Sequence, residues 1–189
     1  DGQKKLLSSK VLIVGAGGLG SPIAIYLAAL GIGNIGIVDN DKVEISNLHR
    51  QILFENSDIK KDKTISASKK LKKINPKIKI ITFQKKLCKS NIKSIIKNFD
   101  VIVDGTDNFK TRFLLNDFCI DNKKILISGA ISKFDGHIYT FNFNDIDNSP
   151  CLRCFIPQMP ANDRNDCEHD GVIGTLAGIV GSIQANEVV

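Results

Sequence analysis

The chain has 189 residues, of which 42% are hydrophobic and 24% are charged, and its formal net charge is +6. This length suits one α/β domain with a buried core and is short for two. No apolar run approaches the ~20 residues of a membrane span, and the polar start is unlike a signal peptide. We therefore expect a protein of the cytosol or of an organelle matrix, with the cytoplasm as the first choice, and no membrane contact. Five cysteines, an odd number, indicate reduced thiols or metal ligands more than a disulfide framework.

The first predicted element is a strand, VLIV at 11–14, that runs into the glycine-rich turn GAGGLG. A strand followed by G-x-G-x-x-G is typical of dinucleotide-binding folds. In this pattern Gly15 permits the tight turn, Gly17 lets a phosphate approach the backbone, and Gly20 permits close helix packing. The turn alone does not identify the nucleotide, because the free N–H groups at a helix start can bind the phosphates of NAD, FAD or ATP.

A helix is predicted after the turn, with Ser21 as its N-cap, Pro22 in its first turn, and Gly31 or Gly33 at its end. Further helices are expected over 63–74 and from Phe109 to about Asp121. The other predicted strands are apolar, β-branched runs at 34–39, 78–83, 101–105 and 125–129, followed by an alternating, half-exposed antiparallel strand at 136–143. This order predicts a Rossmann-like, mostly parallel sheet with helices on both faces and one added antiparallel strand. Residues 144–170 are expected to form a polar loop.

An acidic residue, Asp39, closes the second predicted strand about nineteen residues after the glycine turn. A carboxylate at this place accepts hydrogen bonds from ribose hydroxyls, which argues against NADP because NADP carries a phosphate on the 2′ position. The alternative is an ordinary turn aspartate within DNDK.

The segment EISNLHRQILF is not expected of an NAD dehydrogenase. Asn47, Arg50 and Gln51 place a bidentate cation and two amides where a triphosphate would lie. Lys63 begins the next predicted helix, and Asp107 follows the fourth strand, where parallel strands present ligand-facing groups. Two cations and one carboxylate around a nucleotide indicate phosphoryl or nucleotidyl transfer with Mg²⁺. The alternatives are surface salt bridges for the two cations and a helix N-cap for the carboxylate.

Residues 60–97 hold fourteen lysines and no arginine. Nucleic-acid binding is one hypothesis for such a stretch. It contains a single aromatic residue, Phe83, and no reading motif, so we interpret it as a solvated lysine face without nucleic-acid binding.

Taken together, these motifs resemble the ThiF/MoeB/HesA adenylyltransferases, which are related to ubiquitin-activating enzymes. The resemblance covers nearly the whole chain, and the combination of SNLHRQ, the glycine turn and TDN is highly specific. It is carried by DGQKKLL, VLIVGAGGLGSP, DNDKVEISNLHRQILF, INP, VDGTDNFKTR, CLRC and GVIGTLAGIVGSIQANE.

The resemblance implies ATP-dependent adenylation of the C-terminal glycine of a ubiquitin-like sulfur-carrier protein, in a thiamine, molybdopterin or thiolation pathway. It implies that Gly18 and Asp39 contact ATP and its ribose. It also implies that Asn47, Arg50 and Lys63 contact its phosphates and that Asp107 serves Mg²⁺ or the reacting end. The residues expected at the nucleotide are Gly15, Gly17, Gly18, Gly20, Asp39, Asp41, Asn47, Arg50, Gln51, Lys63, Asp107 and Asn108. The residues expected to be catalytic are Arg50, Lys63, Asp107 and Cys167.

The chain departs from the family pattern at both ends. Family members usually begin with a stretch that carries an arginine reaching the partner subunit's ATP. They also continue past the apolar, small-residue stretch GVIGTLAGIVGSIQANEVV at 171–189, which we interpret as a helix cut before its end. We therefore interpret residues 1–189 as a single adenylation domain, truncated at both ends, of a protein that forms a homodimer.

The motif CLRC places Cys151 and Cys154 at the spacing of half a tetrahedral Zn²⁺ site. Cys167 and His169 could complete it, whereas the resemblance places a second C-x-x-C pair beyond the chain. A thioredoxin-like redox pair is the weaker alternative. By the same resemblance, Cys167 is either a nucleophile that takes the activated carrier or a bystander in a loop. The two remaining cysteines, Cys88 and Cys119, lie in apolar, helical surroundings, so we expect them to be buried.

Two other function classes stay open. An NAD-dependent oxidoreductase would share the glycine turn and Asp39 but leaves Arg50, Lys63 and CLRC unexplained. A non-catalytic subunit of a heterodimeric activating enzyme would keep the fold and lose the cations, which this chain retains.

Overall fold

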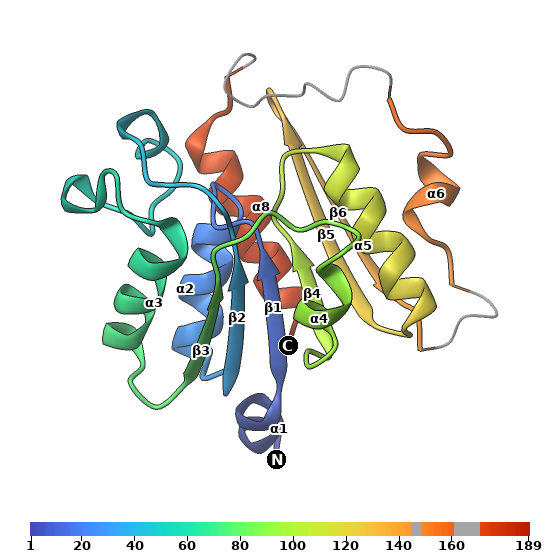
Figure 1. Ribbon diagram of the computed structural model, residues 1–189, viewed down its shortest axis with the longest axis horizontal. Coiled ribbons are helices and arrows are strands. Elements are labelled where there is room, and N and C mark those ends of the chain that lie inside the picture. The colour runs from blue at the N-terminus through green and yellow to red at the C-terminus, as the bar shows by residue number, and fades with distance from the viewer. Residues whose placement is uncertain (145–148, 161–170) are drawn as a thin grey trace.

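A computed structural model describes residues 1–144, 149–160 and 171–189, and Figure 1 shows its central sheet with helices on both sides. The strand order is β3-β2-β1-β4-β5-β6. The strands are β1 (Lys10–Val14), β2 (Asn34–Val38), β3 (Lys79–Phe83), β4 (Val101–Asp104), β5 (Ile125–Ser132) and β6 (Asp135–Asn142). All neighbours pair in parallel except β5 and β6, which are antiparallel. The predicted fold class is confirmed.

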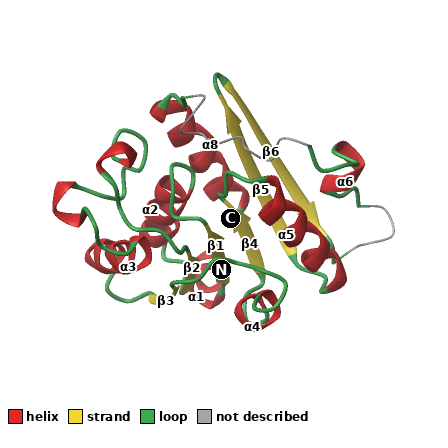
Figure 2. Ribbon diagram, turned by 45° about the horizontal axis from the view of Figure 1, so that its top comes forward, coloured by secondary structure: helices red, strands yellow, loops and turns green. Residues whose placement is uncertain are grey.

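The helices are divided between the two faces of the sheet, as Figures 1 and 2 show. On one face lie α2 (Gly20–Leu30), α3 (Lys63–Ile74) and α8 (Gly174–Glu187), with α2 packed against both others. On the other face lie α4 (Ile92–Ile96) and α5 (Phe109–Asp121), with α6 (Leu152–Phe155) beside α5. A short helix, α1 (Gly2–Ser8), precedes the sheet, and two 3₁₀ turns, η1 (Ile45–Asn47) and η2 (Asn56–Asp58), lie between β2 and α3.

The central strand β1 is buried on both faces, which explains why its sequence is apolar without alternation. Val11 and Ile13 pack into the core beneath α2, α3 and α8. Leu12 and Val14 pack into the second core beneath α4 and α5. The sheet is therefore fixed from both sides, and so are the loops at its ends.

The start of α2 differs from the prediction, whereas its end agrees with it. Gly31 caps the helix with φ 85°, a left-handed conformation that suits glycine. Ser21 is not the N-cap, because the helix begins at Gly20 and Ser21 lies buried inside it. The N-cap position is taken by Leu19, which makes no capping side-chain hydrogen bond, and a Cβ at Gly20 would clash with the carbonyl of Gly15, so the turn needs glycine where it enters the helix.

Three short helices were not expected from the sequence: α1, α4 and α6, of 7, 5 and 4 residues. Segments this short carry little helical periodicity, and tertiary packing stabilises them. Strand β5 also runs three residues past its predicted end at 129, because Ser132 pairs with Asp135 in a hairpin that turns at Lys133, where φ is 50°.

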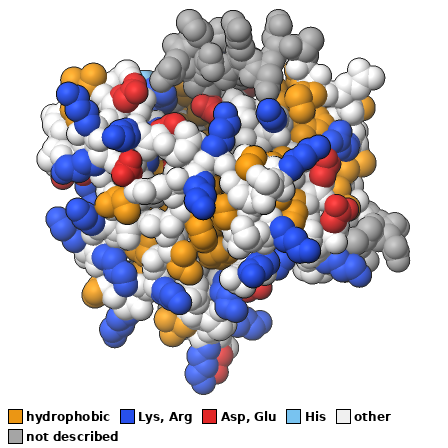
Figure 3. Space-filling view, in the orientation of Figure 1, with side chains coloured by type: hydrophobic (Ala, Val, Ile, Leu, Met, Phe, Trp, Pro, Cys, Tyr) orange, Lys and Arg blue, Asp and Glu red, His pale blue; other side chains and the backbone are white. Residues whose placement is uncertain are grey.

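Lysine side chains are spread over the face of the molecule in Figure 3 rather than gathered into one groove.

In the described part of the chain, no helix is both long and apolar enough to cross a bilayer.

Strand β1 pairs with β2 on one side and with β4 on the other. The chain therefore extends the sheet from β1 in two opposite directions, first through β2 and β3 and then through β4, β5 and β6. A crevice opens at the carboxyl ends of parallel strands at such a point, and ligands bind there in open α/β sheets.

Candidate active site

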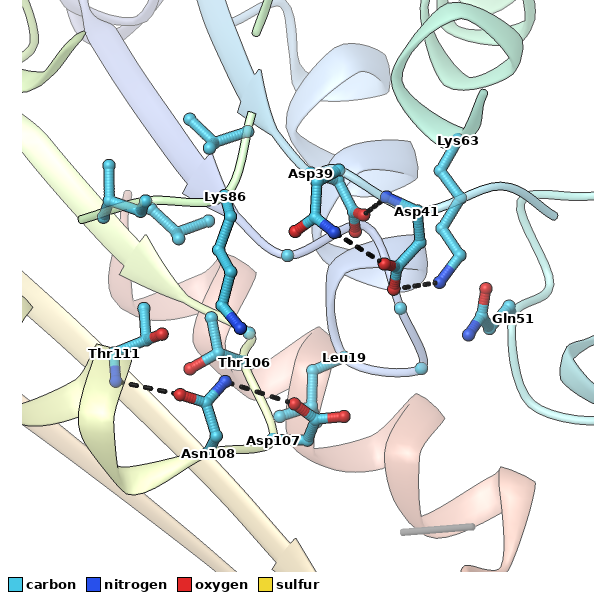
Figure 4. Close-up of a pocket in the computed structure, with 18 of the residues that line it drawn as sticks. Leu19, Asp39, Asp41, Gln51, Lys63, Lys86, Thr106, Asp107, Asn108 and Thr111 are labelled. Carbon is cyan, nitrogen blue, oxygen red and sulfur yellow. Dashed lines mark hydrogen bonds and ion pairs between the residues drawn. The ribbon is translucent and has the colours of Figure 1, made fainter. Parts of the chain in front are cut away.

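A cavity lies at the carboxyl ends of β1, β2 and β4, at the crevice just described. Figure 4 shows the side chains that surround it. The expected residues that line the cavity are Gly15, Gly17, Gly18, Asp39, Asp41, Arg50, Gln51, Lys63, Asp107 and Asn108.

The glycine turn is held against the loop after β4. Gly15 has φ 92°, and a Cβ on it would lie 2.8 Å from the carbonyl oxygen of Gly105. The Gly15 amide donates to Val38 at 2.8 Å, and the Gly105 amide donates to Val14 at 2.9 Å. The three strand ends are therefore tied to one another through backbone hydrogen bonds.

Asp39 braces the turn from the end of β2. One carboxylate oxygen accepts from the Ala16 amide at 2.7 Å, and the other accepts from the Asp41 amide at 2.8 Å. Burial raises the pKa of Asp39, while Lys63 and the two amides oppose that rise. Each carboxylate oxygen keeps a lone pair for a further donor, such as a ribose hydroxyl.

Lys63, the first residue of α3, is buried, and its ammonium lies 3.2 Å from the exposed carboxylate of Asp41. The predicted alternative of a surface salt bridge does not describe this pair, since the lysine side chain is only 7% exposed. A buried cation beside an exposed carboxylate at a cavity wall is suited to an anionic ligand.

Arg50 and Gln51 approach the cavity from the segment after η1. The Arg50 guanidinium donates to the Ser46 carbonyl at 3.1 Å and contacts the His49 ring at 2.7 Å. Gln51 is buried, and its side-chain oxygen has no hydrogen-bond partner among the residues that the structure describes. A buried acceptor without a partner at a cavity wall points to a bound ligand or water.

Asn47 and Gly20 do not line the cavity. The side chain of Asn47 is buried and accepts from the Glu44 amide at 3.3 Å, which closes the η1 turn that precedes Arg50. Gly20 lies against Gly15, in the packing role that its motif predicts.

Asp107 and Asn108 follow β4. Asn108 caps α5 by accepting from the Thr111 amide at 2.9 Å. It also donates to Asp107 at 3.4 Å. The cap predicted as an alternative for Asp107 is therefore supplied by Asn108, and the Asp107 carboxylate is exposed at the cavity, as Figure 4 shows.

A buried ion pair beneath this loop was not predicted. Asp104, at the end of β4, is fully buried and accepts from both the amide and the hydroxyl of Thr106, at 3.0 and 2.7 Å, and from Ser128 at 2.9 Å. Arg112 lies 3.9 Å from Asp104 and donates to the Thr106 carbonyl at 2.7 Å. Burial raises the pKa of Asp104, and Arg112 opposes this. All three polar groups of Thr106 are thereby held, one residue before Asp107.

In the sequence, the Asp104–Arg112 ion pair is indicated by a single aspartate at the end of an otherwise apolar strand. A second group missed from the sequence comprises Lys85, Lys86 and Leu87, which reach the cavity from the loop after β3. Their place in the fold, and not a sequence motif, identifies these three residues as part of the cavity wall.

Cys151 and Cys154 lie at the two ends of the first turn of α6, with their sulfur atoms 3.9 Å apart. Two thiolates on one tetrahedral Zn²⁺, each bound at about 2.3 Å, lie ~3.8 Å apart. Among the described residues no group of three or more metal-ligating side chains occurs. The expectations for Cys167 and His169 fall on residues outside the described ranges.

The other two cysteines of the expected set, Cys88 and Cys119, differ in burial. Cys119 is buried as expected, and burial raises the pKa of its thiol to about 12. The expectation for Cys88 was wrong: it is exposed in the loop after β3, because Leu87 takes the buried position there.

The model of the ThiF family matches residues 1–189. The chain is 45% identical over 189 residues to the adenylyltransferase and sulfurtransferase MOCS3 of Dictyostelium discoideum, and 46% identical over 191 residues to a probable molybdopterin-synthase adenylyltransferase of Porphyra purpurea. Both alignments cover 100% of this chain but 44% and 49% of the relatives, so the chain spans about half their length.

A sulfur carrier protein adenylyltransferase of Thermus thermophilus is 40% identical, over 99% of this chain and 70% of its own. Among solved structures, Escherichia coli MccB with ATP has a TM-score of 0.82 at 23% identity, covering 98% of this chain and 56% of that chain. MccB with MccA-N7isoASN has a TM-score of 0.86 at 23% identity and the same coverage. These two structures share the fold.

Proposed function

Since this chain belongs to the ThiF family, we propose that it adenylates the C-terminal glycine carboxylate of a ubiquitin-like sulfur-carrier protein, with ATP as the second substrate. The pathway is one of molybdopterin, thiolation or thiamine synthesis, and the proposed location is the cytoplasm. The observation that carries the proposal is one cavity that combines a glycine turn with Asp39, Arg50 and Lys63. The MOCS3 and sulfur-carrier relatives support the reaction class by their names.

The residues present fit ATP. The buried ammonium of Lys63 and the guanidinium of Arg50 offer positive charge to phosphates, and the glycine turn offers backbone N–H groups beside the start of α2. The side-chain oxygen of Gln51, which has no partner within the described ranges, offers an acceptor to the ligand or its water. An NAD-dependent oxidoreductase would use Asp39 and the turn but would leave the two cations without a purpose.

The chemistry follows from charge. A carrier carboxylate oxygen forms a bond to the α-phosphorus of ATP, and the bond from that phosphorus to the bridging oxygen breaks, so that pyrophosphate leaves with its electron pair. A carboxylate is a weak nucleophile that approaches an anionic phosphate. Arg50 and Lys63 lower this repulsion, while Asp39 and the glycine turn hold the nucleotide in line. No proton transfer is needed, which agrees with the absence of a histidine among the cavity-lining residues that the structure describes.

Mg²⁺ fits the exposed carboxylate of Asp107, because this ion prefers oxygen ligands and binds through one or two carboxylates together with substrate phosphates. When bound, it would stabilise charge on the departing pyrophosphate. Asp41 is already engaged by Lys63, so we assign the metal to Asp107.

Zn²⁺ fits the cysteine pair, whose sulfur spacing matches two ligands of a tetrahedral site. We propose a structural zinc per chain, held by Cys151, Cys154 and two ligands from outside the described residues. The redox alternative is weaker, because α6 has only four residues and does not directly follow a strand.

A homodimer is supported by exposed apolar side chains on two packed helices. Tyr26 and Leu30 on α2, and Ile179 and Ile183 on α8, are exposed at positions one turn apart. Exposed large apolar side chains on adjacent helices are typical of a protein interface. Light scattering on an Ile179→Asp variant should show monomers if this face is the interface.

Cys167 stays a prediction. If it takes the activated carrier, Cys167→Ser leaves ATP–pyrophosphate exchange intact and abolishes a thiol-sensitive adduct with the carrier on gels, because adenylation precedes transfer. An adduct that persists in the variant would assign the thiol elsewhere.

The function itself is tested by ATP–pyrophosphate exchange in the full-length protein with candidate carriers, together with calorimetry of ATP·Mg²⁺, ADP and NAD. We expect carrier-dependent exchange and binding of ATP in preference to NAD. Tight NAD binding without ATP binding would refute the proposal.

A further inference from the structure

The arginine at the cavity is held by its neighbour in the sequence. One terminal nitrogen of Arg50, Nη1, makes two contacts: it donates to the Ser46 carbonyl at 3.1 Å, and it lies 2.7 Å from Nε2 of His49. A guanidinium nitrogen can only donate, so Nε2 of His49 is the acceptor and carries no proton. The His49 ring is therefore neutral, with its proton on Nδ1.

The aliphatic part of Arg50 is also packed. A Cβ on Gly18 would lie 3.6 Å from Cγ of Arg50 and 3.3 Å from Cβ of Ala177, so this part of the side chain lies beside the glycine turn and α8. A Cβ on Gly174 would clash with the His49 carbonyl, so the first turn of α8 lies against the same backbone. With the backbone and the aliphatic part fixed, the two contacts at Nη1 set the orientation of the guanidinium.

The elements that pack against His49 and Arg50 carry little further charge. The η1 turn contributes Glu44, whose side chain closes the capping box of that turn. The glycine turn has no charged residue, and the charged residue of α8 is Glu187, at its far end, where it accepts from Thr140 at 2.7 Å. The titratable side chains that line the cavity together with Arg50 are Asp39, Asp41, Lys63, Lys85, Lys86 and Asp107.

We propose that neutral His49 is a positioning residue for Arg50, which it holds in the orientation that meets the phosphates of ATP. His49 does not line the cavity, so it acts through the arginine and not on the substrate. The inference rests on the proposed function, because it takes ATP as the ligand of Arg50. Protonation of His49 would put a donor on Nε2 and a second positive charge beside the guanidinium, and both changes break the contact.

The proposal gives the pH dependence of exchange a defined sign. Histidine side chains change charge between pH ~5 and 8, and a guanidinium that has turned away loses its preorganised place at the reacting phosphate. Exchange should therefore fall as the pH drops through this range. A purely electrostatic role for His49 has the opposite sign, since protonated His49 would add positive charge near the phosphates and raise exchange toward acid.

The test measures ATP–pyrophosphate exchange across this pH range in the full-length protein. His49→Gln keeps an acceptor that does not titrate, and His49→Leu removes the acceptor. The matched control is His137→Gln, at an exposed histidine of β6 that does not line the cavity. The ratio of the wild-type rate to the His49→Gln rate at each pH cancels the titration of the carrier and of Asp39, Asp41 and Asp107, which both proteins share. Thermal unfolding checks the fold.

We expect this ratio to fall by about three- to ten-fold toward acid, for one hydrogen bond to a charged group. His49→Leu should lose a similar factor at alkaline pH, His49→Gln should lose less, and His137→Gln should follow the wild type. In an Arg50→Ala background, His49→Leu should have no further effect. A ratio that is constant or rises toward acid would overturn the inference, as would a full effect of His49→Leu without Arg50.

A measurement that needs no carrier separates this inference from the proposed function. In protein with isotope-labelled histidine, nuclear magnetic resonance of the ring nitrogens reports the tautomer, and the signals lost in His49→Gln identify His49. We expect the proton on Nδ1, which is the less common tautomer of free histidine. A proton on Nε2 at alkaline pH would overturn the inference. The expected tautomer in a wild-type protein without carrier-dependent exchange would instead refute the proposed function.

Discussion

The cavity at the strand ends, where we propose that ATP binds, and the cysteine pair of this chain are built in opposite ways. The cavity draws polar groups from the ends of three neighbouring strands, and hydrogen bonds or ion pairs tie Asp39, Lys63 and Thr106 to the surrounding loops. The cysteine pair lies on the one-turn helix α6, which is joined to α5 by two contacts. The Leu152 amide donates to Asn116 at 2.8 Å, and Arg153 forms an ion pair with Asp117 at 2.7 Å.

The cavity is held together by bonds among its own residues, whereas the cysteine pair provides only two of the four ligands of a tetrahedral zinc site. The parallel sheet fixes its strand ends before any ligand arrives, so the cavity can bind with little rearrangement. The two thiols are held at the right spacing but need further ligands to make a metal centre. We therefore expect the two regions to respond independently to mutation.

The largest effect is expected in the cavity. Lys63→Ala should lower ATP–pyrophosphate exchange by about 10²- to 10³-fold, because one preorganised charge at a reacting phosphate is lost. Zinc content should not change. The control is Lys69→Ala, an exposed lysine of the same helix. Wild-type exchange in Lys63→Ala would remove this residue from the reaction.

The next largest effect is expected at the cysteine pair. Cys154→Ser in the full-length protein should reduce bound zinc from about one per chain to near zero, since serine is a poor zinc ligand. ATP affinity should stay within error of the wild type, and Cys88→Ser, at an exposed thiol, is the control. Equal zinc in both variants would rule the site out. A parallel loss of ATP affinity would break the independence of the two regions.

A smaller effect is expected at Asp39. Asp39→Ala should weaken nucleotide binding by ~1 to 3 kcal/mol, because the ribose hydroxyls and the Ala16 and Asp41 amides lose a shared acceptor. Calorimetry with ATP measures this. Unchanged affinity would favour the simple turn role for Asp39.

The pH dependence of the same site has a defined sign. Burial raises the pKa of Asp39, and ribose hydroxyls bind the ionised form, so ATP affinity should fall as the pH drops through this raised pKa. The fall should begin at a higher pH than for an ordinary aspartate. In the nucleotide-free protein the sign is reversed: ionised Asp39 lowers the free energy of unfolding at neutral pH, and acid relieves that cost. Asp39→Asn should remove this titrating component from ATP affinity measured across the acid range.

The smallest effect tests how the cavity is braced. Arg112→Lys keeps a positive charge near Asp104 but loses the forked group that also reaches Thr106. We expect the free energy of unfolding to fall by about 1 kcal/mol, measured by urea denaturation, for the loss of one buried hydrogen bond. Lys110→Ala, exposed on the same helix, should leave stability within ~0.5 kcal/mol. A loss of zinc in Arg112→Lys would show that the bracing extends to α6.

Much of the fold could be predicted because it depends on local patterns. Apolar, β-branched runs located β1 to β5, alternation located β6, and Gly31 located the end of α2 correctly. The short helices α1, α4 and α6 could not be found in the same way, since a helix of one or two turns depends on what it packs against.

The sequence by itself determined which chemical groups are available: the glycine turn, the ribose-binding candidate Asp39, the cations Arg50 and Lys63, and the cysteine pair. Their motifs are short and contiguous, so spacing along the chain carries the information. Only the tertiary structure decided how they are used. It turned Asn47 inward to close η1, paired Asp104 with Arg112 beneath Asp107, and brought Lys86 into the cavity from a loop with no motif. Burial and cavity lining depend on contacts between segments far apart in the sequence, and no local pattern encodes them.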